Sequence, residues 1–101
     1  MFKLDLHKDV EKDLEQLPDN VYDEVYDMLR NLSIDPYKYT QELDDIFGID
    51  LRSYRKTYVA DMKYRIVSKI IDNKVQIVQI IAIGKRDDLE VYKEAFRRLQ
   101  S

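Results

Sequence analysis

Cysteine is absent from this 101-residue chain, and histidine occurs once, at position 7. The missing thiols exclude disulfide bonds, thiolate-bound metals and cysteine nucleophiles. With only two glycines the chain has no glycine-rich phosphate-binding loop. His7 lies just ahead of the first expected helix, where a surface role is favoured over catalysis. The sequence therefore offers few of the residues on which familiar catalytic sites are built.

Long apolar runs are also missing. No run approaches the ~20 residues that a membrane-spanning helix needs, and residues 1–10 carry charges throughout, so we expect no signal peptide and no membrane contact. Apolar residues still make up 45% of the chain, enough for a packed core. The length suits one domain over residues 1–101. We expect a cytoplasmic, single-domain protein.

Positive charge is scarce overall but unevenly distributed. The net charge is −3. Residues 1–47 contain 5 Lys and Arg against 13 Asp and Glu, whereas residues 48–101 contain 12 against 7. Such asymmetry between halves is informative where the net charge is not, although acidic helices and basic strands by accident remain the alternative. Any chemistry directed at anions is expected in the C-terminal half.

The N-terminal half has the pattern of a strand followed by two helices. Apolar and polar residues alternate over residues 2–6, which predicts a short strand. Apolar residues then recur at helical spacing over residues 10–17 and 21–32, with Asp19 or Asn20 available to cap the second helix. Two amphipathic helices with a tight joint indicate a helical hairpin.

The C-terminal half has the pattern of three strands and a helix. Residues 33–50 are predicted to be irregular. Stretches of strand character follow over residues 54–59, 63–71 and 75–83. Their short connections favour hairpins, and the third stretch is apolar enough to be a central strand covered on both faces. Asp87 or Asp88 is expected to cap a final helix.

These elements predict an α+β fold of order β-α-α-β-β-β-α. An antiparallel central sheet would carry an N-terminal helical hairpin and a C-terminal helix. Side chains of a strand alternate between faces, and the two strands of a hairpin are neighbours. One expected open face therefore carries Lys56, Tyr58, Lys63, Arg65 and Lys69.

Crowded cations on one sheet face call for an explanation. Like charges repel, so such a face is suited to an anion, and arginine forks match phosphate geometry. Lys85 and Arg86, just past the third strand, can join the same rim. The alternative is a solvated face whose lysines discourage edge pairing. Tyr92 shares a helical face with Leu89 and Phe96, so core packing and base stacking both remain open for it.

Three segments carry a resemblance to a known family. They are Lys56-Thr57-Tyr58, Lys63-Tyr64-Arg65-Ile66-Val67, and Ile83-Gly84-Lys85-Arg86 followed by Glu90-Val91-Tyr92. In these segments the chain resembles the RelE-like branch of the RelE/ParE toxin superfamily, whose fold has the same order of elements. The resemblance implies a toxin of a type II toxin–antitoxin system, neutralised by an antitoxin protein. RelE-like members cut messenger RNA in the ribosomal A site, by attack of a 2′-hydroxyl on the adjacent phosphate, without metal or cofactor.

The resemblance also implies residue roles. Lys56 matches a lysine that helps to deprotonate or stabilise the attacking oxygen. Arg65 and Arg86 match arginines that hold the phosphate and stabilise charge in the transition state. Tyr92 matches a tyrosine that stacks on or orients the nucleotide. Further substrate contacts are expected from Arg55, Tyr58, Lys63 and Lys85, and no residue is expected to bind a metal.

Two positions depart from the family pattern, and they leave alternatives open. Tyr58 stands where a second basic residue is frequent, and Ser68 stands where an aromatic residue is common. A ParE-like gyrase inhibitor on the same fold is one alternative to a ribonuclease. A catalytically weakened member that mainly binds its antitoxin is another. In each case we expect an acidic or amphipathic partner segment over the basic face.

Overall fold

The longest helix packs through a single apolar stripe. The computed structural model describes residues 1–43, 51 and 53–100. Helix α2 (Asp19–Ile34) buries every third or fourth residue, and these are Val21, Val25, Leu29 and Leu32. Such spacing places the four side chains on one face, which lies against the sheet. The short helix α1 (Val10–Glu15) precedes it, so the two predicted N-terminal helices are confirmed.

Five strands form one mixed sheet in the order β1-β5-β4-β3-β2. Their bounds are β1 (Lys3–Leu6), β2 (Gln41–Glu42), β3 (Arg55–Val59), β4 (Tyr64–Asp72) and β5 (Gln76–Lys85). Strands β2 to β5 pair antiparallel, and β1 pairs parallel with β5. The apolar β5 therefore lies inside the sheet, as predicted, because burial on both faces suits a central strand.

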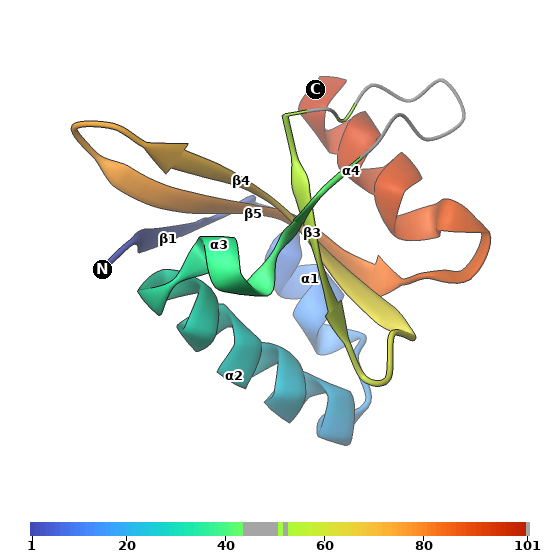
Figure 1. The fold of residues 1–101 in the computed structure, drawn as a ribbon. Coiled ribbons are helices and arrows are strands. Elements are labelled where there is room, and N and C mark those ends of the chain that lie inside the picture. The colour runs from blue at the N-terminus through green and yellow to red at the C-terminus, as the bar shows by residue number, and fades with distance from the viewer. Residues whose placement is uncertain (44–50, 52, 101) are drawn as a thin grey trace.

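Helices cover both faces of this sheet (Figure 1). Helices α1 and α2 enclose one core with side chains such as Val59 and Ile66. Helix α4 (Glu90–Gln100) encloses a second core on the opposite face, with Val67 and Tyr92 among its residues. Neighbouring residues Ile66 and Val67 belong to different cores because strand side chains alternate. The α+β fold predicted from the sequence is confirmed.

Several local predictions were wrong. The face expected to be open is partly covered by α4, because Arg65 is only 8% exposed. Helix α2 begins at Asp19, and its cap position is Pro18, without a side-chain hydrogen bond. Asp87, one of the two predicted caps of the final helix, lies in a 3-10 turn, η1 (Asp87–Leu89), ahead of α4.

The segment predicted to be irregular contains two short elements, α3 (Pro36–Tyr39) and β2. Proline at the first position of α3 suits a helix start, since its missing N–H is not needed there. Residues 44–50 of the same segment lie outside the described residues. Among the helices that the structure describes, none is long and apolar enough to cross a membrane.

Candidate functional site

Arg65 lies between two tyrosine rings. It is the cross-strand partner of Tyr58, so both side chains project from the same face of the β3–β4 hairpin. The Arg65 guanidinium carbon is 4.4 Å from the centre of the Tyr58 ring and 5.3 Å from that of Tyr92. A guanidinium close to an aromatic ring is attracted to its π-electrons, so both rings favour the cation in this position.

The hydroxyl of Tyr92 fixes Arg65 further. Arg65 Nη1 donates a hydrogen bond to this hydroxyl from β4 to α4. The Tyr92 ring is fully buried and belongs to the core under α4, so the core packing left open for it is what the structure shows. A role in stacking on or orienting the nucleotide stays a prediction.

Two more cations approach Tyr58. Lys56, two residues earlier on β3, places Nζ 5.3 Å from the Tyr58 ring centre. The pKa of the Tyr58 phenol is lowered from its usual value of 10.0, mainly by a hydrogen bond from Lys56. Desolvation opposes this shift, and the charges of Arg65, Lys56 and Arg86 add to it. The structure thus brings Lys56 and Arg65 to the Tyr58 ring, and Arg86 lies near enough for its charge to act on the phenol.

Arg86 reaches this place because β5 ends beside the β3–β4 turn. Its backbone N–H donates to the carbonyl of Lys63 at 3.0 Å, one residue beyond the last β4–β5 pair, Tyr64 with Lys85. The Arg86 side chain itself is exposed. We call the five residues Lys56, Tyr58, Arg65, Arg86 and Tyr92 the Tyr58 cluster.

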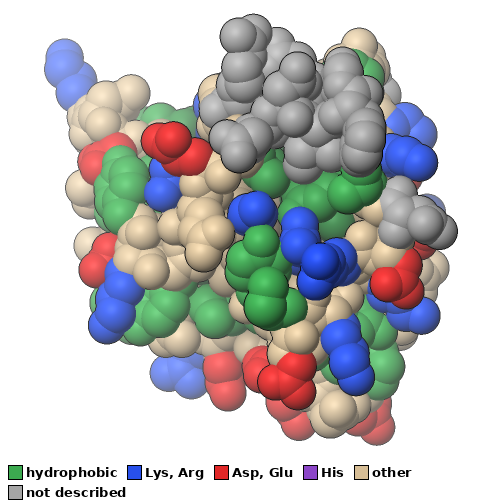
Figure 2. Space-filling view, turned by 45° about the vertical axis from the view of Figure 1, so that its right-hand side comes forward, with side chains coloured by type: hydrophobic (Ala, Val, Ile, Leu, Met, Phe, Trp, Pro, Cys, Tyr) green, Lys and Arg blue, Asp and Glu red, His purple; other side chains and the backbone are tan. Residues whose placement is uncertain are grey.

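The Tyr58 cluster has an excess of positive charge. Within the described part of the chain, none of its three cations forms an ion pair with a carboxylate. Lys69 continues the cationic face along β4, with Nζ 5.4 Å from the centre of the Tyr54 ring. Figure 2 shows Lys and Arg side chains gathered near the middle of one face, beside hydrophobic side chains. Such a surface attracts anions.

Arg55 is not part of this face, so the structure does not group it with the other predicted site residues. Its Nε donates to the Thr40 hydroxyl at 2.6 Å, and its guanidinium carbon is 5.7 Å from the Tyr37 ring centre. Glu42 lies 3.9 Å from its Nη1. Arg55 precedes Lys56 on β3, so the alternation of the strand directs it to the opposite face.

Lys63 and Lys85 also lie away from the predicted place. Lys85 is the cross-strand partner of Tyr64, which packs with the core of α1 and α2. Its side chain is therefore on the face opposite to Arg65. Lys63 lies in the turn and lines a groove of about 410 Å³ that also includes Val21 and Glu24 of α2. The structure thus groups neither lysine with the Tyr58 cluster.

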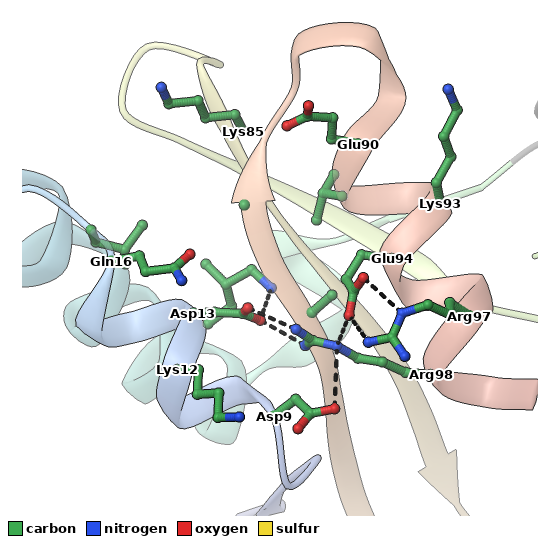
Figure 3. Close-up of a pocket in the computed structure, with 15 residues that line it drawn as sticks. Asp9, Lys12, Asp13, Gln16, Lys85, Glu90, Lys93, Glu94, Arg97 and Arg98 are labelled. Carbon is green, nitrogen blue, oxygen red and sulfur yellow. Dashed lines mark hydrogen bonds and ion pairs between the residues drawn. The ribbon is translucent and has the colours of Figure 1, made fainter. Parts of the chain in front are cut away.

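Another groove lies between α1, the end of β5 and α4 (Figure 3). It has a volume of about 870 Å³, and no member of the Tyr58 cluster lines it. Arg98 binds Asp13 and Glu94 there, and Arg97 binds Glu94. The four carboxylates that line the groove nearly balance its five cations, so it is the poorer candidate for an anion site.

The Tyr58 cluster is equipped for binding and reacting with phosphate. Guanidinium groups stay protonated at any working pH, so Arg65 and Arg86 can bind phosphate oxygens and stabilise charge but cannot accept a proton. Lys56 and Tyr58 are the two members beside them that can exchange one. No group of three or more His, Asp or Glu side chains suited to a metal ion occurs in the described residues.

Sequence reasoning missed the central position of Tyr58. It was expected only to contact the substrate, yet the cations converge on its ring and hydroxyl. The signal was present, because Lys56, Tyr58 and Arg65 share one face of a hairpin by alternation. The approach of Arg86 depends on where β5 ends, which the pattern of the strand alone does not show.

Comparison with known proteins gives two consistent results and one without a match. No family model matches the chain. The mRNA interferase toxin RelE of Escherichia coli K12 is 40% identical over 57 residues, which are 56% of this chain and 50% of that protein. The mRNA interferase RelE of Shigella flexneri matches equally. The matching segment thus spans about half the length of these relatives.

Solved structures match over more of the chain. A mutant of the E. coli RelE toxin in the free state superposes with a TM-score of 0.68 and 26% identity, covering 97% of both chains. The RelBE2 toxin–antitoxin complex of Mycobacterium tuberculosis gives a TM-score of 0.69 at 20% identity, covering 84% of this chain and 98% of that one. The resemblance inferred from the sequence is therefore confirmed. This chain is RelE-like in fold over nearly its whole length and in sequence over about half of it.

Proposed function

We propose that this chain is the toxin of a toxin–antitoxin pair and cleaves messenger RNA in the ribosomal A site. The proposal rests on one observation above all, the position of Lys56 and Arg65 at the Tyr58 ring, with Arg86 near enough for its charge to act on the phenol. The relatives named mRNA interferases support the reaction class. A gyrase inhibitor would not need these cations around an aromatic ring, which makes it the weaker candidate.

In this reaction the 2′-hydroxyl of one nucleotide attacks the phosphorus that joins it to the next. Negative charge builds up on the phosphate oxygens as the new bond forms. Arg65, held by two rings and a hydroxyl, offers a fixed cation for that charge, and the exposed Arg86 side chain can close on the phosphate. Preorganised cations lower such a barrier without a metal ion.

The proposed partner is an antitoxin that covers the Tyr58 cluster. Structural neighbours of the chain include RelE–RelB complexes from M. tuberculosis and Pyrococcus horikoshii. A cationic face with half-buried tyrosines such as Tyr54 and Tyr58 is complementary to an acidic or amphipathic segment. Neutralisation would then follow from masking the cations, in the cytoplasm, where the ribosomes are.

The test is inducible expression in bacteria with mapping of messenger RNA 5′ ends. Three chains are compared: wild type, Arg86→Ala, and Lys74→Ala as a control in the exposed β4–β5 turn. Wild type and Lys74→Ala should arrest growth and produce new 5′ ends within reading frames, and Arg86→Ala should do neither. Intact messenger RNA during arrest by wild type, or cleavage that persists in Arg86→Ala, would contradict the proposal. DNA damage with intact messenger RNA would indicate the gyrase alternative.

A further inference from the structure

Positively charged side chains from separate elements lie near Tyr58. Lys56 approaches from the same strand, Arg65 from the paired strand β4, and Arg86 from the segment after β5. Tyr92 of α4 stands behind Arg65 and holds it. Among the described residues, the charged groups that act on the Tyr58 hydroxyl are thus all cations.

This surrounding favours the deprotonated form of the phenol. Each neighbouring cation stabilises a phenolate, and the loss of one proton from Tyr58 relieves part of the repulsion among three positive side chains. The Arg65 guanidinium lies over the ring face at 4.4 Å, where it interacts with the π-electrons of either form. The pKa of the phenol is lowered accordingly, with the hydrogen bond from Lys56 as the largest cause.

The other members of the Tyr58 cluster are less suited to accept a proton. Arg65 and Arg86 remain protonated. Lys56 Nζ lies 5.3 Å from the Tyr58 ring centre, and as an ammonium group it donates hydrogen bonds and accepts none. The Tyr92 hydroxyl is buried and already accepts from Arg65. Tyr58 is half-buried, so its hydroxyl is the remaining group of the cluster that can reach a substrate hydroxyl and accept its proton.

We infer that the Tyr58 phenolate is the general base of the proposed cleavage, with Lys56, Arg65 and Arg86 holding it in the reactive form. The inference rests on the proposed function and assigns a catalytic role to the residue that departs from the basic pattern of the family. A base must lie within hydrogen-bond reach of the proton it removes, and Tyr58 projects from the middle of the cationic face where a phosphate would bind.

The step balances as follows. The phenolate oxygen of Tyr58 takes the proton of the 2′-hydroxyl, and the 2′-oxygen forms a bond to the adjacent phosphorus. The bond from phosphorus to the 5′-oxygen of the next nucleotide breaks, and that oxygen leaves with the electron pair and takes a proton from solvent. The products are a 2′,3′-cyclic phosphate and a 5′-hydroxyl end. Tyr58 then returns its proton to solvent.

A first experiment measures the phenol without any RNA. Carbon-13 is introduced at Cζ of every tyrosine, and the signal of Tyr58 is assigned by its loss in Tyr58→Phe. We expect this signal to titrate below the ordinary tyrosine pKa of ~10, and to shift upward in Lys56→Met. A midpoint at or above the ordinary value, or one that does not respond to Lys56→Met, would overturn the inference.

A second experiment measures cleavage on programmed ribosomes as a function of pH. Removing a general base slows such reactions roughly 10²–10⁴-fold, so Tyr58→Phe should fall in this range. Its rate should also lose the rise with pH that wild type shows up to the Tyr58 midpoint. Tyr26→Phe, an exposed tyrosine on α2, is the matched control and should behave as wild type.

The outcomes separate this inference from the proposed function. If wild type does not cleave messenger RNA at all, both are wrong. If wild type cleaves and Tyr58→Phe keeps its rate and its pH profile, the base role alone is wrong. Phenylalanine preserves the ring on which Arg65 stacks, and unfolding curves of the variant verify that any loss of rate is not a loss of folding.

Discussion

Arg98 and Asp13 form a bidentate ion pair, in which Nη1 and Nη2 of Arg98 each lie 2.7 Å from a carboxylate oxygen of Asp13. The pair joins α4 to α1 across β5. Arg98 Nη1 also donates to the Ile81 carbonyl at 2.8 Å, and Asp13 accepts from the Ile83 N–H at 3.0 Å. Pairing with β1 ends at Ile80. The two side chains thus satisfy backbone groups of β5 beyond the end of the neighbouring strand.

Asp13→Ala should destabilise the fold strongly. The Arg98 side chain is only 4% exposed, so the variant would leave a buried cation with one partner fewer. Breaking a buried pair on one side typically costs about 3–5 kcal/mol. Urea unfolding followed by circular dichroism measures the loss. Arg97→Ala is the control, since that side chain is 63% exposed and its pair with Glu94 is worth at most about 1 kcal/mol.

A double variant that replaces both charged residues tests whether the ion pair itself stabilises the fold. Asp13→Leu with Arg98→Met removes both ions and leaves apolar groups of similar length, and such exchanges are often neutral. We expect the double variant to recover most of the stability lost in Asp13→Ala. If it is the less stable of the two, the backbone hydrogen bonds to Ile81 and Ile83 outweigh the ion pair.

Glu94 gives a prediction for acid pH. Hydrogen bonds from Arg97 and then Arg98 lower its pKa to about 2, against desolvation. Because the folded value lies below the ordinary ~4.3, the carboxylate stabilises the fold fully above the ordinary value. This contribution is lost as the pH falls from there toward 2. Wild type should therefore be more stable than Glu94→Gln at pH 6, and the two should converge near pH 2. A constant difference would contradict the assignment.

Strand alternation explains why much of the candidate site was predictable. The period of two is a property of the pleated backbone, so Lys56, Tyr58 and Arg65 had to share a face once the hairpin was recognised. The same rule, applied strictly, would have excluded Arg55, which precedes Lys56 by one position. It could not have excluded Lys85, because the predicted third strand ended at residue 83 whereas β5 runs to Lys85.

Other features depend on contacts that no local pattern encodes. The burial of Arg65 follows from the place where α4 crosses the sheet, which is determined by packing of the second core. The parallel pairing of β1 with β5 joins segments about 74 residues apart, such as Lys3 with Ile77. Local propensity predicted both strands, but their neighbours follow from the tertiary fold.

Tyr92→Phe should weaken both the fold and the proposed cleavage. The variant removes the hydroxyl that accepts from Arg65, whose Nε is already buried without a partner among the described residues. An unsatisfied buried donor costs about 1–3 kcal/mol. Loss of the hydroxyl would also free the guanidinium to turn, so the cleavage rate should fall more than the affinity for ribosomes.

The control for Tyr92→Phe is Tyr54→Phe. Tyr54 packs against the same core and lies under Lys69, so the exchange removes a phenol oxygen without touching Arg65. Its stability and cleavage should stay near those of wild type. Equal effects of the two exchanges would show that the Tyr92 hydroxyl does not position Arg65.

The adjacent cations Arg55 and Lys56 should separate stability from chemistry. Arg55→Ala removes a charged hydrogen bond to Thr40, worth about 1.5–3 kcal/mol, and a contact with the Tyr37 ring. Lys56→Ala removes one of three clustered cations, so the free energy of unfolding should stay equal or rise. Cleavage should show the reverse order, with Arg55→Ala active below its melting temperature and Lys56→Ala inactive.

Unfolding curves and ribosome cleavage assays on the same preparations measure both the stability and the activity of the two variants. Loss of cleavage in folded Arg55→Ala would mean that the site extends to both faces of β3, because one backbone position separates these side chains.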